Sequence, residues 1–151
     1  MKNPVLTAIA TGFGTGFSPM APGTAGSIAA ALIFLAVSAI GPSAPWMAFA
    51  ALVPLSFAGA AHGVRMWGRD PSRVTIDEIA GCWAACLAAP HGILWLLAAV
   101  LLFRFFDILK PWPVSLFDAM EGSAGVVLDD LAAGVMAAAV LGIAGVLSGA
   151  R

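Results

Sequence analysis

Charged residues are scarce in this chain, and their scarcity excludes most classes of soluble protein. Only 10% of the 151 residues are charged, whereas 61% are hydrophobic and the mean hydropathy is +0.98. Soluble domains usually carry about 25% charged and about 45–50% apolar residues. A soluble fold of this length would have more apolar surface than its interior could hold, so the composition predicts an integral membrane protein. The absence of a basic stripe argues against a nucleic-acid partner.

Cysteine and histidine are too few for a structural metal site. Cys82 and Cys86 are four residues apart, so on a helix they share one face without readily forming a disulfide. His62 and His91 do not complete a finger-like ligand spacing. We interpret the cysteines as small packing residues and the histidines as packed or interfacial residues. The N-terminal segment, interrupted by glycine and proline, lacks the apolar core of a signal peptide, so we expect no cleavage.

Five hydrophobic stretches are long enough, or nearly so, to cross a membrane as helices. They are residues 26–40, 46–64, 74–90, 92–106 and 125–147. A helical span needs roughly 20 residues, with about 17–25 usual. Small residues recur in these stretches and permit close helix packing in lipid. We therefore predict an all-α integral membrane protein, with about five transmembrane helices in a compact bundle and a single domain over residues 1–151.

The segment from residue 4 to residue 25 is apolar but rich in glycine and proline, which is typical of a re-entrant loop or a short half-helix. Glycines let a backbone approach a ligand closely, and the amides that begin the helix after Gly26 would favour an anion. No Gly-Lys-Ser/Thr sequence follows, so a nucleotide P-loop is not indicated. We predict a phosphate cradle whose substrate-binding residues are Ser18, Gly23, Thr24 and Ser27.

The connections between the stretches alternate sharply in charge. Residues 41–45 and 90–92 carry none unless His91 is protonated. The remaining connections hold nearly all the ionic residues, and their basic members are Arg65, Arg69, Arg73, Arg104 and Lys110. The positive-inside rule places these connections and the N-terminus in the cytoplasm.

Three of the predicted helices bring carboxylates to that same membrane face. Asp77 and Glu78 open the third stretch, Asp107 ends the fourth, and Asp129 and Asp130 lie about one turn inside the fifth. An acid at the centre of a span costs about 2.5–3.5 kcal/mol on insertion scales, and clustered carboxylates repel one another. A shared divalent cation compensates both effects, and an oxygen-only ligand set favours Mg²⁺, Mn²⁺ or Ca²⁺ over zinc.

Some of these charges have simpler interpretations. Asp107 could merely pair with Arg104 or Lys110. Five further charges are interpreted as solvated loop residues: Arg65, Asp70, Arg73, Asp118 and Glu121.

Four sequence blocks, in this order, resemble the phosphatidylglycerophosphatase A family. They are residues 16–27 (GFSPMAPGTAGS), 76–81 (IDEIAG), 103–113 (FRFFDILKPWP) and 128–134 (LDDLAAG). The resemblance implies a multi-pass enzyme of the bacterial inner membrane that depends on Mg²⁺. Its expected reaction removes the terminal phosphate from phosphatidylglycerophosphate and leaves phosphatidylglycerol in the membrane.

The resemblance and the carboxylates together suggest a mechanism. Metal ligands are expected at Asp77, Glu78, Asp129 and Asp130, which would hold one or two Mg²⁺ ions. Asp107 would be a further ligand or a base, and the expected catalytic set therefore comprises Asp77, Glu78, Asp107, Lys110, Asp129 and Asp130. Arg104, Lys110 and the glycine-rich segment would bind the phosphoryl group. We favour attack by a water that the cation activates, because no Ser-His or Cys-His pair is evident; a carboxylate nucleophile is the alternative.

Other classes of protein could also use such a cluster. A small ion-coupled membrane transporter would bury acids too, but nearer the midplane and with access from both faces. A purely structural assembly protein would leave the Asp129–Asp130 pair unexplained. A phospholipid synthase acting on a CDP-lipid would need a spaced acidic motif that this sequence lacks.

Overall fold

The computed structural model describes residues 3–68 and 71–150, and all regular structure within them is helical. In chain order the elements are α1 (Pro4–Ala10), the 3₁₀ helix η1 (Gly12–Phe17), α2 (Pro22–Ser38), α3 (Ala44–Trp67), α4 (Ile76–Ala88), α5 (Ile93–Leu109), α6 (Val114–Asp118) and α7 (Ser123–Leu147). The all-α fold class is therefore confirmed. Arg69 and Asp70, two of the expected loop charges, lie outside the described residues.

The helices begin and end at residues whose backbone preferences explain the boundaries. Pro22 lies in the first turn of α2, where a missing amide hydrogen costs nothing. Gly68 follows α3 with φ 94°, and Gly122 precedes α7 with φ 85°. Such left-handed backbone is readily available to glycine, so it turns the chain between helices.

Two of the described helices, α3 with 24 residues and α7 with 25, have the length and apolar composition to cross a membrane. Helices α2 and α5 have 17 residues each, and α4 has 13. At 1.5 Å per residue α4 is about 20 Å long, which is short of a bilayer core of about 30 Å. The five hydrophobic stretches thus correspond to five helices, whereas the number of spans stays a prediction.

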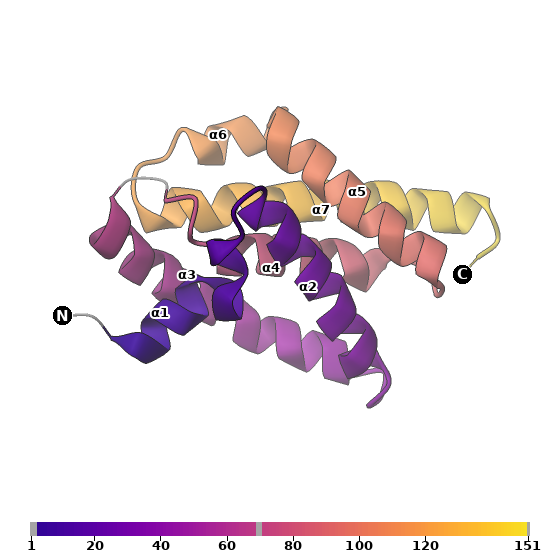
Figure 1. The fold of residues 1–151 in the computed structure, drawn as a ribbon. Coiled ribbons are helices and arrows are strands. Elements are labelled where there is room, and N and C mark those ends of the chain that lie inside the picture. Colours follow the sequence, from indigo (N-terminus) through magenta and orange to yellow (C-terminus); the bar gives the residue numbers. More distant parts are fainter. Residues whose placement is uncertain (1–2, 69–70, 151) are drawn as a thin grey trace.

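Helix α4 lies at the centre of the bundle and contacts α2, α3, α5 and α7 (Figure 1). Ten of its 13 residues are buried. Its approach to α7 is very close, because a Cβ built on Gly81 would lie only 2.5 Å from the carbonyl oxygen of Asp130. Gly134 of α7 likewise lies against the backbone of Gly81. This glycine contact brings the first half of α4 against the middle of α7, where Asp130 lies.

The outer faces of α2, α5 and α7 expose large apolar side chains. Leu32 is 63% exposed, Leu101 is 70% exposed and Ile143 is 64% exposed. Soluble monomers rarely expose apolar patches of more than a few hundred Å². The exposed face of these helices therefore matches the apolar composition and is suited to contact with lipid.

The N-terminal segment forms helical turns that pack against the bundle. Helix α1 contacts α3, where Thr7 Oγ1 and His62 Nε2 are 3.0 Å apart in a hydrogen bond. Thr15 of η1 forms a 2.8 Å hydrogen bond with Thr75, directly before α4. The amide of Thr75 also donates to the carbonyl oxygen of Ala10 at 2.9 Å. The segment is thus anchored at the end of α4 that carries Asp77 and Glu78.

Candidate functional site

Three carboxylates from two helices meet at one end of the bundle. Asp77 and Glu78 come from the first turn of α4, and Asp130 comes from α7. Each offers an oxygen atom, and these oxygens all lie within 4.8 Å of one another. Asp77 and Asp130 are each only 4% exposed. Because the backbones of α4 and α7 touch at Gly81, these acids cannot move far apart.

The donor set of this acidic cluster, Asp77, Glu78 and Asp130, fits a hard divalent cation. All three ligand groups offer oxygen, which such cations prefer. The Oε2 atom of Glu78 is buried and has no hydrogen-bond partner among the described residues. A buried polar atom without a partner carries a desolvation cost, which a cation in contact with it would offset. The cluster can therefore hold a metal ion.

An arginine and a glycine lie directly beside the cluster. Arg104 of α5 pairs with Asp107 one turn later, with 2.5 Å between Nη1 and Oδ2. Its buried Nε has no partner among the described residues. A Cβ built on Gly23 would lie 2.5 Å from Glu78 Oε1 and 2.8 Å from Arg104 Nη1. The start of α2 therefore presents bare backbone to both a carboxylate and a guanidinium group.

A lysine ion pair adjoins the cluster through Asp129, the neighbour of Asp130. Lys110 ends α5 in the left-handed conformation, with φ 46°. Its Nζ donates to Asp118 and, at 2.8 Å, to Oδ2 of Asp129. Burial alone would lower the pKa of Lys110, but the hydrogen bonds to Asp118 and Asp129 outweigh it and raise that pKa above its ordinary value. Lys110 therefore carries a positive charge at neutral pH.

The structure separates the four expected metal ligands into two environments. Asp77, Glu78 and Asp130 meet, whereas Asp129 faces Lys110 and its Oδ1 accepts the amide of Asp130 at 3.0 Å. Adjacent helical residues point about 100° apart, which explains the division. A metal-binding role for Asp129 stays a prediction.

The expected phosphate-cradle residues are partly engaged with the backbone. Ser27 is buried, and its hydroxyl donates to the carbonyl oxygen of Gly23 at 2.8 Å. Ser18 and Thr24 are half-buried on either side of the start of α2. Of these four residues, Gly23 is the one placed against the cluster. Substrate binding by Ser18, Thr24 and Ser27 stays a prediction.

Two features of the site could not be read from the sequence. Asp118 was interpreted as a solvated loop charge, yet it pairs with Lys110 eight residues earlier. The turn through Pro111 and Pro113 that joins α5 to α6 brings the two together. Thr15 and Thr75 were not singled out, although they join η1 to the start of α4. The hydroxyl of Thr15 within a glycine-rich segment was the feature of the sequence that could have indicated this contact.

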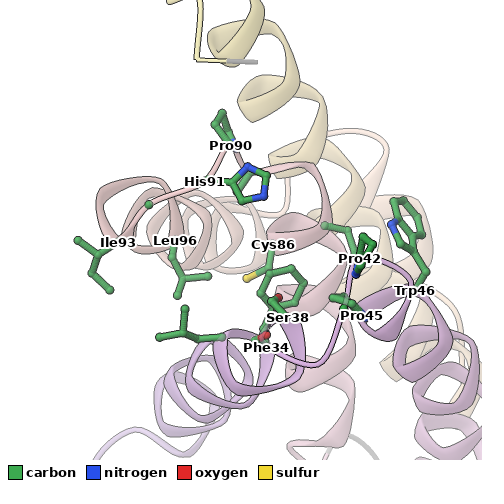
Figure 2. A pocket seen from close by; sticks show the side chains of 15 residues that line it. Phe34, Ser38, Pro42, Pro45, Trp46, Cys86, Pro90, His91, Ile93 and Leu96 are labelled. Carbon is green, nitrogen blue, oxygen red and sulfur yellow. Dashed lines mark hydrogen bonds between the residues drawn. The ribbon is translucent and has the colours of Figure 1, made fainter.

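Two cavities lie at opposite ends of the bundle. One, of about 240 Å³, is bordered by Asp118 and Asp129 next to the acidic cluster. The other, of about 420 Å³, is drawn in Figure 2, where Phe34, Cys86 and His91 surround it. This far cavity lies between the α2–α3 and α4–α5 connections, and no carboxylate is among its described lining residues. His91 is thus remote from the acids, and the chemistry belongs to the first end.

Buried carboxylates beside an arginine and a lysine, at one end of an apolar helical bundle, form a site that could hold a cation. The chain belongs to the Phosphatidylglycerophosphatase A family, whose model matches residues 8–145. It is therefore an enzyme of the lipid phosphatase class. The matched region includes all four of the sequence blocks described above, so the resemblance is confirmed.

Three curated bacterial proteins are similar over most of their length. A Bacteroides thetaiotaomicron protein with the provisional name phosphatidylinositol-3-phosphatase is 44% identical, with 93% of this chain and 92% of that protein aligned. Proteins named Phosphatidylglycerophosphatase A from Escherichia coli and Haemophilus influenzae are each 34% identical. Those alignments cover 93% of this chain, and 83% and 88% of the relatives, respectively. No solved structure matches.

Proposed function

We propose that this protein hydrolyses phosphatidylglycerophosphate to phosphatidylglycerol and phosphate, in an Mg²⁺-dependent step of phospholipid biosynthesis. The observation that supports it most directly is the acidic cluster, with Arg104 near Glu78 and Lys110 paired with Asp129, the neighbour of Asp130. A terminal phosphate carries negative charge, which needs a cation beside the carboxylates and positive side chains around its oxygens.

The names of the relatives leave two lipid headgroups to compare. Two relatives are named for phosphatidylglycerophosphate, and the one with higher identity is named for an inositol phosphate. Both are phosphomonoesters attached to a lipid through an alcohol. We choose phosphatidylglycerophosphate because the family model that spans residues 8–145 carries that name.

Asp77, Glu78 and Asp130 are proposed to hold the Mg²⁺ ion. When bound, the ion supplies positive charge to phosphoryl oxygens and acidifies a neighbouring water. Arg104 donates from its guanidinium group to the phosphoryl oxygens, and Asp107 keeps that group in place through their ion pair. Gly23 lets the start of α2 pack directly against Glu78 and Arg104, since a Cβ there would collide with both side chains.

Lys110 contributes charge rather than a proton. Its raised pKa keeps it an ammonium group, which stabilises the negative charge that develops on the leaving oxygen. Asp129 and Asp118 fix its position by accepting its hydrogen bonds. Water attacks phosphorus, the ester P–O bond breaks, and one proton of the water is carried by the released alcohol.

The membrane arrangement follows from the same elements. We propose that α2, α3, α4, α5 and α7 cross the bacterial inner membrane as one domain, with the acidic cluster at the cytoplasmic face. The α1–η1 segment is then the re-entrant element that covers the short α4. Arg65 and Arg73 are exposed at the ends of the α3–α4 connection, beside the acidic cluster, which agrees with the positive-inside rule.

Phosphate release in detergent micelles tests this function. Wild type and Asp130→Asn would be assayed on phosphatidylglycerophosphate and on phosphatidylinositol 3-phosphate, with Mg²⁺ or with EDTA. We expect release from phosphatidylglycerophosphate that requires Mg²⁺ and is lost in Asp130→Asn. If folded wild type acts only on the inositol lipid, the choice of phosphatidylglycerophosphate as substrate is wrong. If activity persists in EDTA, the proposed requirement for Mg²⁺ is wrong.

A further inference from the structure

The cavity of about 240 Å³ beside the acidic cluster has a lining of its own. It lies where the end of α3, the α6–α7 connection and the first turns of α7 meet. Its polar wall consists of Asp118 and Asp129, and its apolar wall includes Val64 and Val126. Gly125 also lines it and packs against the α6–α7 connection, because a Cβ there would lie 2.3 Å from the carbonyl oxygen of Met120.

The lining of this cavity, which we name the alcohol cavity, favours hydrogen-bond donors that are not anionic. Asp118 and Asp129 are acceptors when ionised, and none of the described lining residues is cationic. A phosphate group placed there would face two like charges, whereas an alcohol hydroxyl would find acceptors. Asp118 already accepts a hydrogen bond from Lys110, but a carboxylate has about four lone-pair sites. It retains capacity for a hydroxyl.

The position of the alcohol cavity relates it to the acidic cluster. Asp129 lines the cavity, and the next residue, Asp130, belongs to the cluster. Lys110 bridges the two carboxylates of the cavity wall. The cavity is therefore one residue along α7 from the cluster, on the side of Asp129 and Lys110.

We propose that the alcohol cavity receives the hydroxyl-bearing alcohol of the substrate headgroup, with Asp118 accepting the hydrogen bond of its free hydroxyl and Val126 limiting its size. This inference rests on the proposed phosphatase function. It makes Asp118 and Val126 specificity-determining residues, and it explains why an acid outside the acidic cluster is held beside Lys110.

A pair of substrates that differ by one hydroxyl tests the inference. Phosphatidylglycerophosphate would be compared with an analogue whose headgroup is propane-1,3-diol phosphate, in detergent micelles with Mg²⁺. Loss of a hydrogen bond to a charged group corresponds to roughly 10- to 150-fold, and the partial exposure of Asp118 favours the lower end. We expect wild type to prefer the glycerol substrate by about tenfold in kcat/KM, and Asp118→Ala to show a ratio near one.

The outcomes separate this inference from the proposed function. Wild type that hydrolyses both lipids with equal kcat/KM overturns the inference and leaves the phosphatase function standing. A preference that survives in Asp118→Ala overturns the assignment of Asp118. Wild type that releases phosphate from neither lipid overturns the proposed function, and this inference with it.

A steric variant tests the cavity independently of Asp118. Val126→Phe narrows the alcohol cavity, and Val140→Phe makes the same change on the exposed face of α7. We expect Val126→Phe to lower kcat/KM for phosphatidylglycerophosphate about tenfold more than for an analogue with the smaller ethane-1,2-diol headgroup. Val140→Phe should leave the ratio unchanged. An equal decrease for both lipids in Val126→Phe overturns the inference.

Discussion

Glu78 and Arg104 each contain a buried polar atom that has no partner among the described residues, and the two side chains face each other across Gly23. Groups in such a position lose their hydration without recovering it within the protein. A binding site accounts for this cost, because a cation and a phosphoryl group restore the missing contacts when they bind.

Replacing Glu78 by glutamine should weaken cation binding. Glu78→Gln removes a negative charge from the acidic cluster while retaining the shape of the side chain. We expect the affinity for Mn²⁺, measured by titration of the detergent-solubilised protein, to fall by about tenfold or more. Glu121→Gln, an exposed neutralisation, is the matched control and should change little. Equal Mn²⁺ affinity in wild type and Glu78→Gln would remove Glu78 from the ligand set.

A methyl group at Gly23 should block the site. The Cβ of Gly23→Ala would lie 2.5 Å from Glu78 Oε1, so the carboxylate or the start of α2 must shift. Misplacement by about 1 Å can cost about 100-fold in rate, and we expect a loss of this order in phosphate release. Gly26→Ala, whose nearest neighbour would be the Thr75 carbonyl oxygen at 3.3 Å, should lose much less. Comparable losses in both variants would contradict a specific role for Gly23.

At the scale of elements, the contact between α4 and α7 determines which acids meet. Both helices carry an adjacent pair of acids, and helix geometry separates the members of each pair by about 100°. The Gly81–Gly134 contact fixes how the helices are rotated about their axes, so that Asp130 faces Asp77. Asp129 is turned toward Lys110 by the same rotation.

Crowding that contact should reduce stability and activity together. Gly134→Ala would place a methyl group against the backbone of Gly81, and overpacking of this kind typically costs about 1–3 kcal/mol. We expect a lower thermal unfolding midpoint in detergent and a proportionate loss of Mg²⁺-dependent activity. Val135→Ala, at the neighbouring 62% exposed position, should stay within about 0.5 kcal/mol of wild type. An unchanged midpoint in Gly134→Ala would show that α4 and α7 have room to separate.

At the scale of the whole molecule, the two ends of the bundle differ in charge. The acidic cluster, Arg104 and Lys110 occupy one end, and the cavity drawn in Figure 2 occupies the other. Between them, α2, α5 and α7 expose a continuous series of apolar side chains. This arrangement suits a protein whose ends face opposite sides of a bilayer.

Cysteine accessibility tests that orientation. Ser43, in the α2–α3 connection, and Ser72, in the α3–α4 connection, are both exposed, while the native Cys82 and Cys86 are buried. We expect a membrane-impermeant maleimide to label Ser43→Cys in intact cells and Ser72→Cys only in inverted vesicles. The opposite pattern would place the acidic cluster on the outer side, and labelling of both in intact cells would argue against a membrane-spanning arrangement.

The all-helical class, the approximate positions of the main helices and the family are predictable from the amino-acid sequence. These follow from composition, from runs of apolar residues and from four ordered blocks, all of which are local properties of the chain. The acids Asp77, Glu78 and Asp130 were also identifiable, because carboxylates in apolar helices have no inexpensive solvation.

Which side chains lie together depends on how the helices pack against one another. Helix α4 is buried on nearly all sides, so its hydrophobic pattern does not show which face meets α7. The division between Asp129 and Asp130 depends on the rotation of α7, which the contact between Gly81 and Gly134 sets. The pairing of Asp118 with Lys110 depends on the path of the α5–α6 turn. The rotation of α7 and the path of the α5–α6 turn both arise from packing between segments that are distant in the sequence. A local sequence pattern does not specify them.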